Sequence, residues 1–411
     1  MWLPKRSSYF SVPDNYLKEI FNVISKYPIC NILDLGSGRT SIFLKKYCSY
    51  TNNLFSIENN KKYYDLLIEN YPEIKDNLYL CETITNENES YYINLNSIIQ
   101  DIKFDLISID GPYGYGVKHP RTNVIDIINN NQLNDQFFIF LHDTNREGEK
   151  WLIQQIFNVL NTNNYSYSYK YLNMDGGAIL IYNDIYNNDE IICPVCNNTI
   201  NKSSLLSQGY KSSICDKYYI IGAGKRNVKC PICHSIDRSR LTYLYFNNLD
   251  LKNKNILHIA PEIELSKLFD KANIYECLDL NNEQDKYSSL NVKKMDICNI
   301  DYEDNYFDIV ICSHVLEHIN DEFKSISELY RVLKPNGMLI LQVPIAIGLN
   351  NTLNNDSSDL DDPSHKRLYG DNYQRIISMY GFKSQKVYLA NQYPNYGLNP
   401  LEYINIFIKE Q

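Results

Sequence analysis

Four cysteines carry the most specific chemical signal in the sequence. They form two Cys-Pro-x-Cys pairs, Cys193 with Cys196 and Cys230 with Cys233. Each pair can present two thiolates to one tetrahedral Zn²⁺, and two pairs together complete its coordination shell. Because four thiolates leave no open position on the metal, the spacing predicts a structural zinc site and not a catalytic one.

The remaining cysteines predict a reducing environment. The chain has eleven cysteines in all, and Cys30, Cys81, Cys277 and Cys312 fall in or beside apolar runs. Free thiols are common at such buried positions in proteins of the cytosol. No apolar run follows the first residues, so we expect no secretion signal and a cytoplasmic location.

Glycines and acidic residues lie within or directly after the apolar runs of the amino-terminal half. The run Asn31–Leu35 contains Asp34 and leads into a turn with Gly36 and Gly38. Glycines can take positive φ angles and let a ligand approach the backbone. Glu58 ends the next run, where an acid can accept hydrogen bonds from both ribose hydroxyls of an adenosine. The pattern predicts a nucleotide-like cofactor bound by Asp34, Gly36, Gly38 and Glu58.

Two cofactors suit such a turn. Enzymes that bind NAD share the Gly-x-Gly spacing, but Ser41 stands where the dinucleotide motif has its third glycine. This replacement favours S-adenosylmethionine (SAM) over NAD. A turn with a purely structural role is the other interpretation.

Acidic and histidine side chains follow two later apolar runs. Asp110 ends one of them, and His142 and Asp143 follow the run Gln136–Leu141. The carboxyl ends of parallel strands flank the ligand crevice of an open α/β sheet, so we expect these side chains to lie together. Such a group suits a general base for a hydroxyl substrate, or a hard divalent metal such as Mg²⁺. Alternatively, Asp143 only caps a helix that starts near Arg146.

The carboxyl-terminal half repeats this pattern without the glycines. Ala260 and Glu262 form the turn after its first apolar run, and Asp279 ends the second run as the ribose-binding candidate. On physical grounds, Cβ atoms and a carboxylate in this turn crowd an approaching cofactor. Asp296, followed by Ile297, is placed to accept a hydrogen bond from an adenine amino group.

Three histidines of this half are candidate bases. His314 and His318 follow the third apolar run, and His365 lies further along the chain. A histidine near its ordinary pKa can take a proton from a hydroxyl substrate at neutral pH. For each of the three, a purely structural role is the alternative.

An α/β framework must position these residues, because apolar runs alternate with helical patterns. In the first half we expect strands over 31–35, 53–57, 104–109 and 136–141, and helices over 16–26, 41–47, 61–70 and 149–160. In the second half we expect strands over 255–260, 275–279 and 307–312, then a helix, a proline–glycine turn at 335–337 and another strand. The Asn- and Asp-rich stretch 348–362 predicts a mobile loop.

Composition limits the partners. A net charge of −9 argues against a general nucleic-acid or membrane-surface binder. No run of about 18 apolar residues exists, so we expect no membrane span. The oligomeric state is left open.

The first half resembles the plant glucuronoxylan 4-O-methyltransferases and their bacterial relatives. The likeness covers about residues 30–160 and rests on Asp110-Gly-Pro, Pro120-Arg121 and the segment from His142-Asp143 to Glu149-Lys-Trp151. In that family an Asp-Gly-Pro segment and a paired-acid segment border the sugar and SAM sites. His142 stands where such families often have a second acid, which weakens a two-carboxylate metal site and leaves His142 as a base candidate.

The second half resembles bacterial SAM methyltransferases with a Cys-Pro-x-Cys lead-in. His-Val-Leu-Glu-His at 314–318 and Arg-Val-Leu-Lys-Pro-Asn-Gly at 331–337 are typical of the SAM methyltransferase superfamily. The segments 230–240, 257–262 and 365–370 match the narrower group, and the likeness covers nearly all of 190–385. In that group Ala-Pro-Glu replaces the usual glycines of the turn, which offers an answer to the crowding objection.

Together these features predict a bifunctional SAM-dependent O-methyltransferase that acts on sugar hydroxyls, in a nucleotide sugar or a glycan. Two Rossmann-like class I domains, 1–187 and 237–411, would flank a zinc ribbon over 188–236. One alternative is an RNA methyltransferase with a zinc ribbon, which the acidic net charge opposes. Another is a single catalytic half beside a degenerate binding or scaffold half.

Overall fold

The computed structural model describes residues 1–5, 11–49, 51, 53–183, 189–281, 287, 289–354 and 364–410. The chain divides into two compact units. The N-terminal unit is Leu3–Asn188, and the C-terminal unit is Asp189–Gln411 together with Met1–Trp2. The cysteine segment clusters with the C-terminal unit, and the limits expected at 187 and 236 remain predictions.

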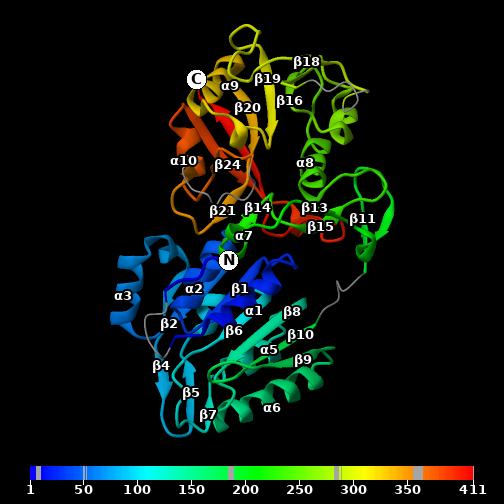
Figure 1. The fold of residues 1–411 in the computed structure, drawn as a ribbon. Helices are drawn as coiled ribbons and strands as arrows, with labels where there is room; N and C mark the ends of the chain where they lie inside the picture. The colour runs from blue at the N-terminus through cyan, green and yellow to red at the C-terminus, as the bar shows by residue number, and fades with distance from the viewer. Residues whose placement is uncertain are drawn as a thin grey trace. The chain divides into compact units, whose positions relative to one another are not determined.

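The N-terminal unit is built on a seven-stranded sheet with the order β3-β2-β1-β6-β8-β10-β9 (Figure 1). The first five strands in this order pair in parallel, and β10 is antiparallel to both of its neighbours. Near-continuous apolar runs form these strands because both faces of a mostly parallel sheet are buried. The strands are β1 Asn31–Leu35, β2 Asn53–Glu58, β3 Leu78–Leu80, β6 Phe104–Ile109, β8 Leu133–His142, β9 Ser168–Leu172 and β10 Ala178–Asn183.

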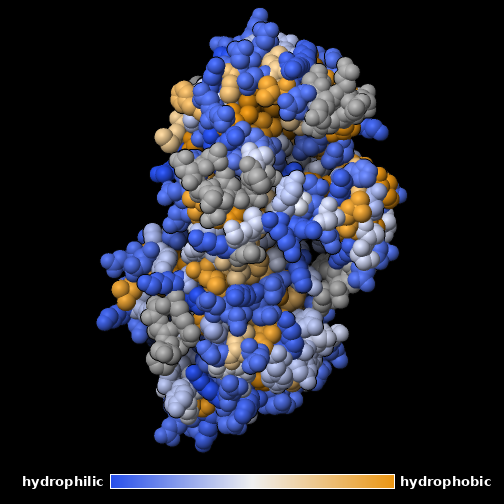
Figure 2. Space-filling model, in the orientation of Figure 1, coloured by the Kyte–Doolittle hydropathy of each residue, from blue (hydrophilic) through white to orange (hydrophobic). Residues whose placement is uncertain are grey.

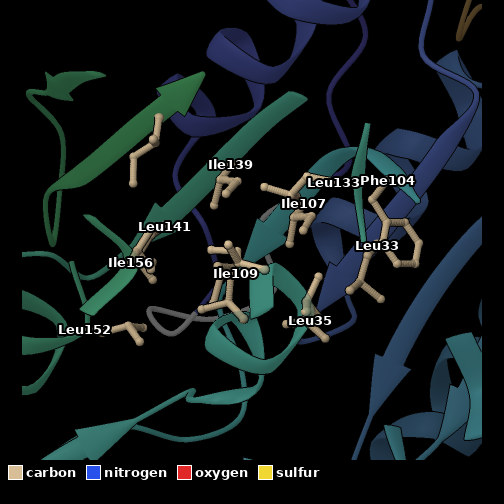
Figure 3. Close-up of a cluster of buried hydrophobic side chains, with 14 of the residues drawn as sticks. Leu33, Leu35, Phe104, Ile107, Ile109, Leu133, Ile139, Leu141, Leu152 and Ile156 are labelled. Atoms are coloured by element: carbon tan, nitrogen blue, oxygen red, sulfur yellow. The ribbon is translucent and has the colours of Figure 1, made fainter. Parts of the chain in front are cut away.

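Helices cover both faces of this sheet. On one face Leu33, Ile107 and Ile139 point into the same core as Leu152 and Ile156 (Figure 3). On the other face helix α1 packs over β8. The helices are α1 Asp14–Ile24, α2 Arg39–Tyr47, α3 Lys61–Asn70, α4 Leu95–Ile99, α5 Asn123–Asn129 and α6 Glu147–Thr162, with a 3₁₀ turn η1 Pro72–Asn77.

The C-terminal unit has a second seven-stranded sheet, with the order β18-β17-β16-β19-β20-β25-β24. Its first five strands are again parallel, and β25 is antiparallel to β20 and β24. The strands are β16 Asn255–Ile259, β17 Ile274–Asp279, β18 Val292–Lys294, β19 Phe307–Ser313, β20 Leu333–Gln342, β24 Phe382–Val387 and β25 Ile404–Lys409. The helical elements are α8 Asp237–Asn247, η3 Ile263–Phe269, η4 Leu316–His318, α9 Glu322–Val332, α10 Tyr373–Ser378 and η5 Ala390–Gln392.

The two sheets agree in topology and in detail. Numbered along the chain within each unit, both have the strand order 3-2-1-4-5-7-6. The backbone N–H of Asn31 donates to Asp105 Oδ2 at 2.7 Å, and that of Asn255 donates to Asp308 Oδ2 at 2.9 Å. Each of these asparagine side chains also donates to the carbonyl just before the fourth strand of its sheet. The same hydrogen bonds therefore join the first strand to the fourth in both units.

Short elements complete the chain. Two- and three-stranded sheets pair β4 Thr83–Thr85, β5 Glu89–Tyr92 and β7 His119–Pro120; β11 Glu190–Ile192 and β12 Thr199–Asn201; β13 Leu206–Gln208 and β15 Arg226–Lys229; β14 Tyr219–Ile221 and β21 Ile345–Ile347; and β22 Leu353–Asn354 and β23 Arg367–Leu368. A short helix α7 Ser213–Lys217 and a 3₁₀ turn η2 Lys202–Ser204 lie in the cysteine segment.

The structure confirms the α/β class and most predicted strands, but it differs at the proline–glycine turn. Helix α9 runs directly into β20. Phe307 of β19 pairs with Leu333 of β20, and Ile309 pairs with Met338. Residues 334–337 therefore form a bulge in β20. Of the loop expected over 348–362, the residues 355–362 lie outside the described part of the chain.

The surface in Figure 2 is mostly hydrophilic, and hydrophobic residues form small separate areas on it. Among the described residues, no helix combines the length and the apolar character that crossing a membrane requires.

Candidate active sites

The glycine turn of the N-terminal unit lies at the carboxyl end of β1. The backbone N–H groups of Gly36 and Ser37 both donate to the carbonyl of Ile57, at 3.2 and 3.0 Å. Gly36 has φ +101°, and a Cβ there would lie 2.5 Å from the backbone nitrogen of Gly111. Only glycine therefore fits where the turn meets the end of β6.

Asp34 lies buried beneath this turn. Its Oδ2 accepts a hydrogen bond of 2.6 Å from Ser41 Oγ, while its Oδ1 has no partner among the described residues. Burial raises the pKa of Asp34 to about 7, against the lowering effect of the hydrogen bond from Ser41. A buried acceptor atom without a donor suits a ligand that brings one, so the turn fits a cofactor with a cationic or donor group.

Glu58, at the end of β2, is fully engaged in this structure. Its Oε2 accepts from Ser37 Oγ at 2.6 Å, and its Oε1 accepts from the backbone N–H groups of Asn59 and Asn60. The backbone bonds orient the carboxylate, and the Ser37 hydroxyl occupies the oxygen on the turn side. A ribose hydroxyl that binds there would replace the Ser37 hydroxyl.

The structure brings Asp110, His142 and Asp143 together, as the sequence predicts. His142 Nδ1 lies 3.0 Å from Asp110 Oδ1 and 3.5 Å from Asp143 Oδ1, and His142 Nε2 lies 3.0 Å from the carbonyl oxygen of Asp175. Burial lowers the pKa of His142, but the hydrogen bond and charge of Asp110 and the charge of Asp143 raise it more, so the net pKa is above its ordinary value. Both ring nitrogens face acceptor oxygens, an arrangement that favours the doubly protonated ring.

Two arginines that sequence reasoning missed as site residues hold this group. Arg121, whose side chain is 2% exposed, donates to the carbonyl of His142 at 3.1 Å and to Asp143 Oδ2 at 3.0 Å. Arg146 Nη1 lies 2.7 Å from the same Asp143 oxygen. Glu149, which is fully buried, lies 3.6 Å from Arg121 and 3.7 Å from Arg146. The only signal was their presence in the segments that carry the family resemblance.

Asp143 does not cap the following helix. Helix α6 begins at Glu147 after Arg146, and no side chain caps that end. The carboxylate of Asp143 is bound instead by Arg121 and Arg146, and its residue has a positive φ of 67°. The capping alternative is therefore wrong.

A divalent metal fits this group poorly. Oxygen and nitrogen atoms of Asp110, His142 and Asp143 lie within 4.8 Å of one another, which a metal site requires. However, Asp143 already pairs with two arginines, and both ring nitrogens of His142 already face oxygen atoms of the protein. Metal ligands must be deprotonated, so Mg²⁺ would have to displace these cations.

The turn after β16 in the C-terminal unit makes the same backbone hydrogen bond as the glycine turn, but it is formed by other residues. The N–H of Ala260 donates to the carbonyl of Leu278, as that of Gly36 does to Ile57, and Ala260 has φ +49°. Glu262 Oε2 lies 3.0 Å from Nε2 of the buried His258. Burial alone would raise the pKa of Glu262, but His258, Arg238 and His314 lower it below its ordinary value. Pairing with His258 therefore holds this carboxylate, and the expected crowding of a cofactor stays a prediction.

The other predicted cofactor residues of this unit lie at neighbouring strand ends. Asp279 ends β17, where its Oδ1 accepts from the N–H of Asn281 and its Oδ2 accepts from the Tyr287 hydroxyl. Asp296 follows β18, and its Oδ1 accepts from the N–H of Cys298 at 2.8 Å. Ile297 is buried beside it. All three lie at or beyond the carboxyl ends of β17 and β18, as the predicted binding roles require.

The three candidate histidines line one cavity of about 260 Å³ in the C-terminal unit, together with Gly222, Arg238 and Glu317. His314 Nδ1 lies 3.1 Å from Glu317 Oε1. Burial and the charge of Arg238 lower the pKa of His314, against the raising effect of Glu317 and Glu262. A histidine with a lowered pKa is neutral at pH 7 and able to accept a proton.

The four cysteines converge in the C-terminal unit. Their sulfur atoms all lie within 4.8 Å of one another, with 3.6 Å between Cys193 and Cys233 and 3.9 Å between Cys196 and Cys230. Four sulfurs at about 2.3 Å from a tetrahedral Zn²⁺ would be about 3.8 Å apart. The donor set and its spacing therefore fit zinc.

Comparisons with known proteins identify the second half more specifically than the first. Residues 265–341 match the family described as a methyltransferase domain, and residues 12–169 match the family described as conserved hypothetical protein 95. An uncharacterized protein of Methanocaldococcus jannaschii is 45% identical over 47 residues, which are 11% of this chain and 20% of that protein. The chain thus spans about a fifth of the length of this curated relative.

Two solved structures are similar to parts of the chain. A SAM-dependent methyltransferase from Archaeoglobus fulgidus is 20% identical over 42% of this chain and 91% of its own, with a TM-score of 0.31. The 1,6-didemethyltoxoflavin-N1-methyltransferase of Burkholderia thailandensis is 12% identical over 39% of this chain and 72% of its own, with a TM-score of 0.26. Residues 265–341 thus match a methyltransferase domain, and this match leaves the methyl acceptor open.

Proposed function

We propose that the chain transfers methyl groups from SAM to sugar hydroxyls at two sites, one in each unit. One observation carries the two-site proposal. Both sheets have the same strand order, and both end their first strand in a left-handed turn that binds the carbonyl of the second strand. In open α/β sheets, the crevice beyond these strand ends is where ligands bind.

When bound, SAM supplies a methyl group on a sulfonium centre. The protein's part is then to hold both reactants in line and to take the hydroxyl proton. In the N-terminal unit, Glu58 would bind the ribose, and the free oxygen of Asp34 would accept a hydrogen bond from the cofactor. In the C-terminal unit, Asp279 would take the role of Glu58, and Asp296 with Ile297 would contact the adenine.

Asp110 is the proposed base of the N-terminal site. Both ring nitrogens of His142 face acceptor oxygens of the protein, so neither is open to a substrate proton. His142 instead fixes Oδ1 of Asp110, which leaves Oδ2 to receive the proton of a sugar hydroxyl. Arg121 and Asp143 hold His142 in place and complete the charge balance.

His314 is the proposed base of the C-terminal site. Its lowered pKa keeps the ring neutral at pH 7, and Glu317 is placed to accept the proton on Nδ1. The Nε2 side of the ring lies beside Gly222, whose missing side chain leaves room at the cavity. A hydroxyl that enters this cavity would meet Nε2.

The acceptor and the zinc belong to the proposal as well. Support for a sugar comes from the resemblance of residues 30–160 to glucuronoxylan methyltransferases and from the polar groups that line both strand edges. Support for a structural Zn²⁺ comes from the four converging sulfurs, which leave no open coordination position.

A calorimetric titration with S-adenosylhomocysteine tests the two-site proposal. We expect two sites per wild-type chain, and one site in each of the variants Glu58→Ala and Asp279→Ala. Asp65→Asn, an exposed change on α3, serves as the matched control and should keep two sites. One site in the wild-type chain would contradict the proposal and indicate one catalytic half beside a degenerate half.

A transfer assay tests the acceptor. Labelled SAM is incubated with uronic-acid oligosaccharides, nucleotide sugars and RNA, and the products are treated with mild alkali. Methyl ethers on sugars survive this treatment, whereas methyl esters do not. Label on RNA alone, or only in alkali-labile form, would contradict sugar O-methylation.

A further inference from the structure

Three side chains that line the cavity of the C-terminal unit lie close to one another. Glu317 and His318 come from η4, and His365 comes from the segment before β23. One potential ligand atom from each lies within 4.8 Å of the other two. The rings of His318 and His365 are 4.7 Å apart between centroids, at an angle of 74°. Segments almost 50 residues apart in the chain therefore place two imidazoles and a carboxylate around one point.

This donor set is typical of a transition-metal site. Two imidazoles and one carboxylate bind Zn²⁺ in hydrolytic enzymes and Fe²⁺ in oxygenases, in both cases with open coordination positions. Mg²⁺ and Ca²⁺ prefer oxygen ligands alone. Metal–ligand bonds of about 2.1 Å place ligand atoms at most about 4.2 Å apart, so small side-chain rotations would close the site.

Glu317 supplies an independent observation. Its side chain is fully buried and its Oε2 has no hydrogen-bond partner among the described residues. Its other oxygen, Oε1, is paired with His314. A buried carboxylate oxygen without a donor is costly, and a cation at the point where His318 and His365 meet would satisfy it.

The surroundings orient these ligands as metal sites require. His318 Nδ1 lies 3.3 Å from the carbonyl of Ser364, which can only accept, so Nδ1 carries the proton and Nε2 keeps its lone pair. Arg367 donates to the carbonyls of Leu316 and Asn320 and so clamps both ends of η4. The backbone N–H of Lys366 donates to the carbonyl of Glu317. The turn that carries two ligands is thus tied to the segment that carries the third.

We propose that Glu317, His318 and His365 bind one divalent transition-metal ion of the Zn²⁺ class, with its open positions toward the cavity. The cavity of about 260 Å³ is also lined by the small residues Gly222, Ala223 and Gly224, which leave room for a small oxygen ligand. The site is distinct from the four-cysteine site, because it contains no thiolate. It does not depend on the identity of the methyl acceptor.

Titration of the metal-free full chain with Co²⁺ tests this proposal. We expect two equivalents per wild-type chain, of which one gives intense thiolate-to-metal charge-transfer absorption and the other gives only weak d–d bands. His318→Ala should lose the second equivalent and keep the first. His318 is exposed, so this change should leave the fold intact, which circular dichroism checks.

Two further variants separate the sites. Cys196→Ser should weaken the charge-transfer band and leave the weak d–d bands. His119→Ala, an exposed histidine of the other unit, is the matched control and should keep both equivalents. A wild-type chain that binds only the thiolate equivalent, or a His318→Ala chain that binds both, would overturn the proposal.

Discussion

The two sheet edges share a backbone and differ in how their charges are balanced. At the N-terminal edge, Asp110 and Asp143 are compensated by His142, Arg121 and Arg146, and the turn requires glycine. At the C-terminal edge, glutamates pair with histidines, and one carboxylate oxygen of Glu317 has no donor among the described residues. One strand order therefore supports a network of arginines and carboxylates in one unit and glutamate–histidine pairs in the other.

Removal of the zinc ion should produce the largest difference between the two units. Structural zinc in small modules contributes apparent binding energies of about 10–16 kcal/mol, and that energy is folding energy. Removing Zn²⁺ with a chelator should abolish hydrogen-exchange protection across residues 189–236, whereas β1 in the N-terminal unit should keep its protection. Unchanged protection in the cysteine segment, with loss of zinc verified by elemental analysis, would rule out a structural role.

The buried arginine should give the next largest effect. Arg121→Met leaves Asp110, Asp143 and Glu149 without their shared cation, and breaking a buried ion pair in this way costs about 3–5 kcal/mol. The free energy of unfolding of the N-terminal unit, measured in denaturant, should fall by that amount. Arg146→Met should cost clearly less, because the Arg146 side chain is 33% exposed. Equal losses would mean that burial does not set the energy of this network.

The acids beneath the two turns should respond to pH with opposite signs. The pKa of Asp34 is raised from 3.8 to about 7, so its ionisation destabilises the fold as pH rises through that range. Asp34→Asn removes this cost and should stabilise the N-terminal unit at pH 8 by at most about 4 kcal/mol, with little change at pH 4. The same variant should weaken cofactor binding.

Glu262 should behave in the reverse way. Its pKa is lowered, so its charge stabilises the fold above its ordinary pKa and that stabilisation disappears as pH falls through the folded value. Glu262→Gln should therefore destabilise the C-terminal unit at pH 8, with a smaller loss at low pH. Stability–pH curves of both variants check the pair, and the same sign for both would break the comparison between the turns.

The smallest expected effect concerns the turn backbone. Ala260 has a positive φ, which costs an L-residue about 1–2 kcal/mol, and glycine recovers part of this at an entropic cost. Ala260→Gly should raise the free energy of unfolding by about 1 kcal/mol. Asn336→Gly, also at a positive φ, should gain less because asparagine tolerates that region. A destabilised Ala260→Gly chain would show that the Ala260 side chain contributes packing.

The sequence predicted the parts of each unit that depend on local patterns. The run Asn31–Leu35 is rich in large apolar residues, and the structure has a strand over those residues. The spacing of the four cysteines predicted that the two pairs lie together, because one shared metal ion must contact the thiolates of both pairs. Strand ends placed Asp110, His142 and Asp143 correctly, because parallel strands bring their carboxyl ends to one edge.

Contacts between distant segments could not be predicted in this way. Arg121 has a positive φ, and its side chain contacts His142 and Asp143, which lie more than 20 residues away in the sequence. The helical or strand periodicity of the sequence does not indicate such a contact. The unpartnered oxygen of Glu317 is visible only once its neighbours are in place. The Pro335–Gly337 segment looks like a turn by composition, but pairing with β19 and β25 keeps it within β20 as a bulge.

In each seven-stranded sheet, the last strand along the chain lies inside the sheet and not at its edge. β10 pairs with β8 and β9, and β25 pairs with β20 and β24. During synthesis, the first sheet has all seven of its strands once residue 183 has emerged, while the second sheet lacks an inner strand until residue 409 has emerged. A ribosome stalled after residue 387 has emerged, but before residue 404 has, would carry one complete sheet together with β20 and β24 without the strand that lies between them, and such unpaired strand edges are prone to aggregation.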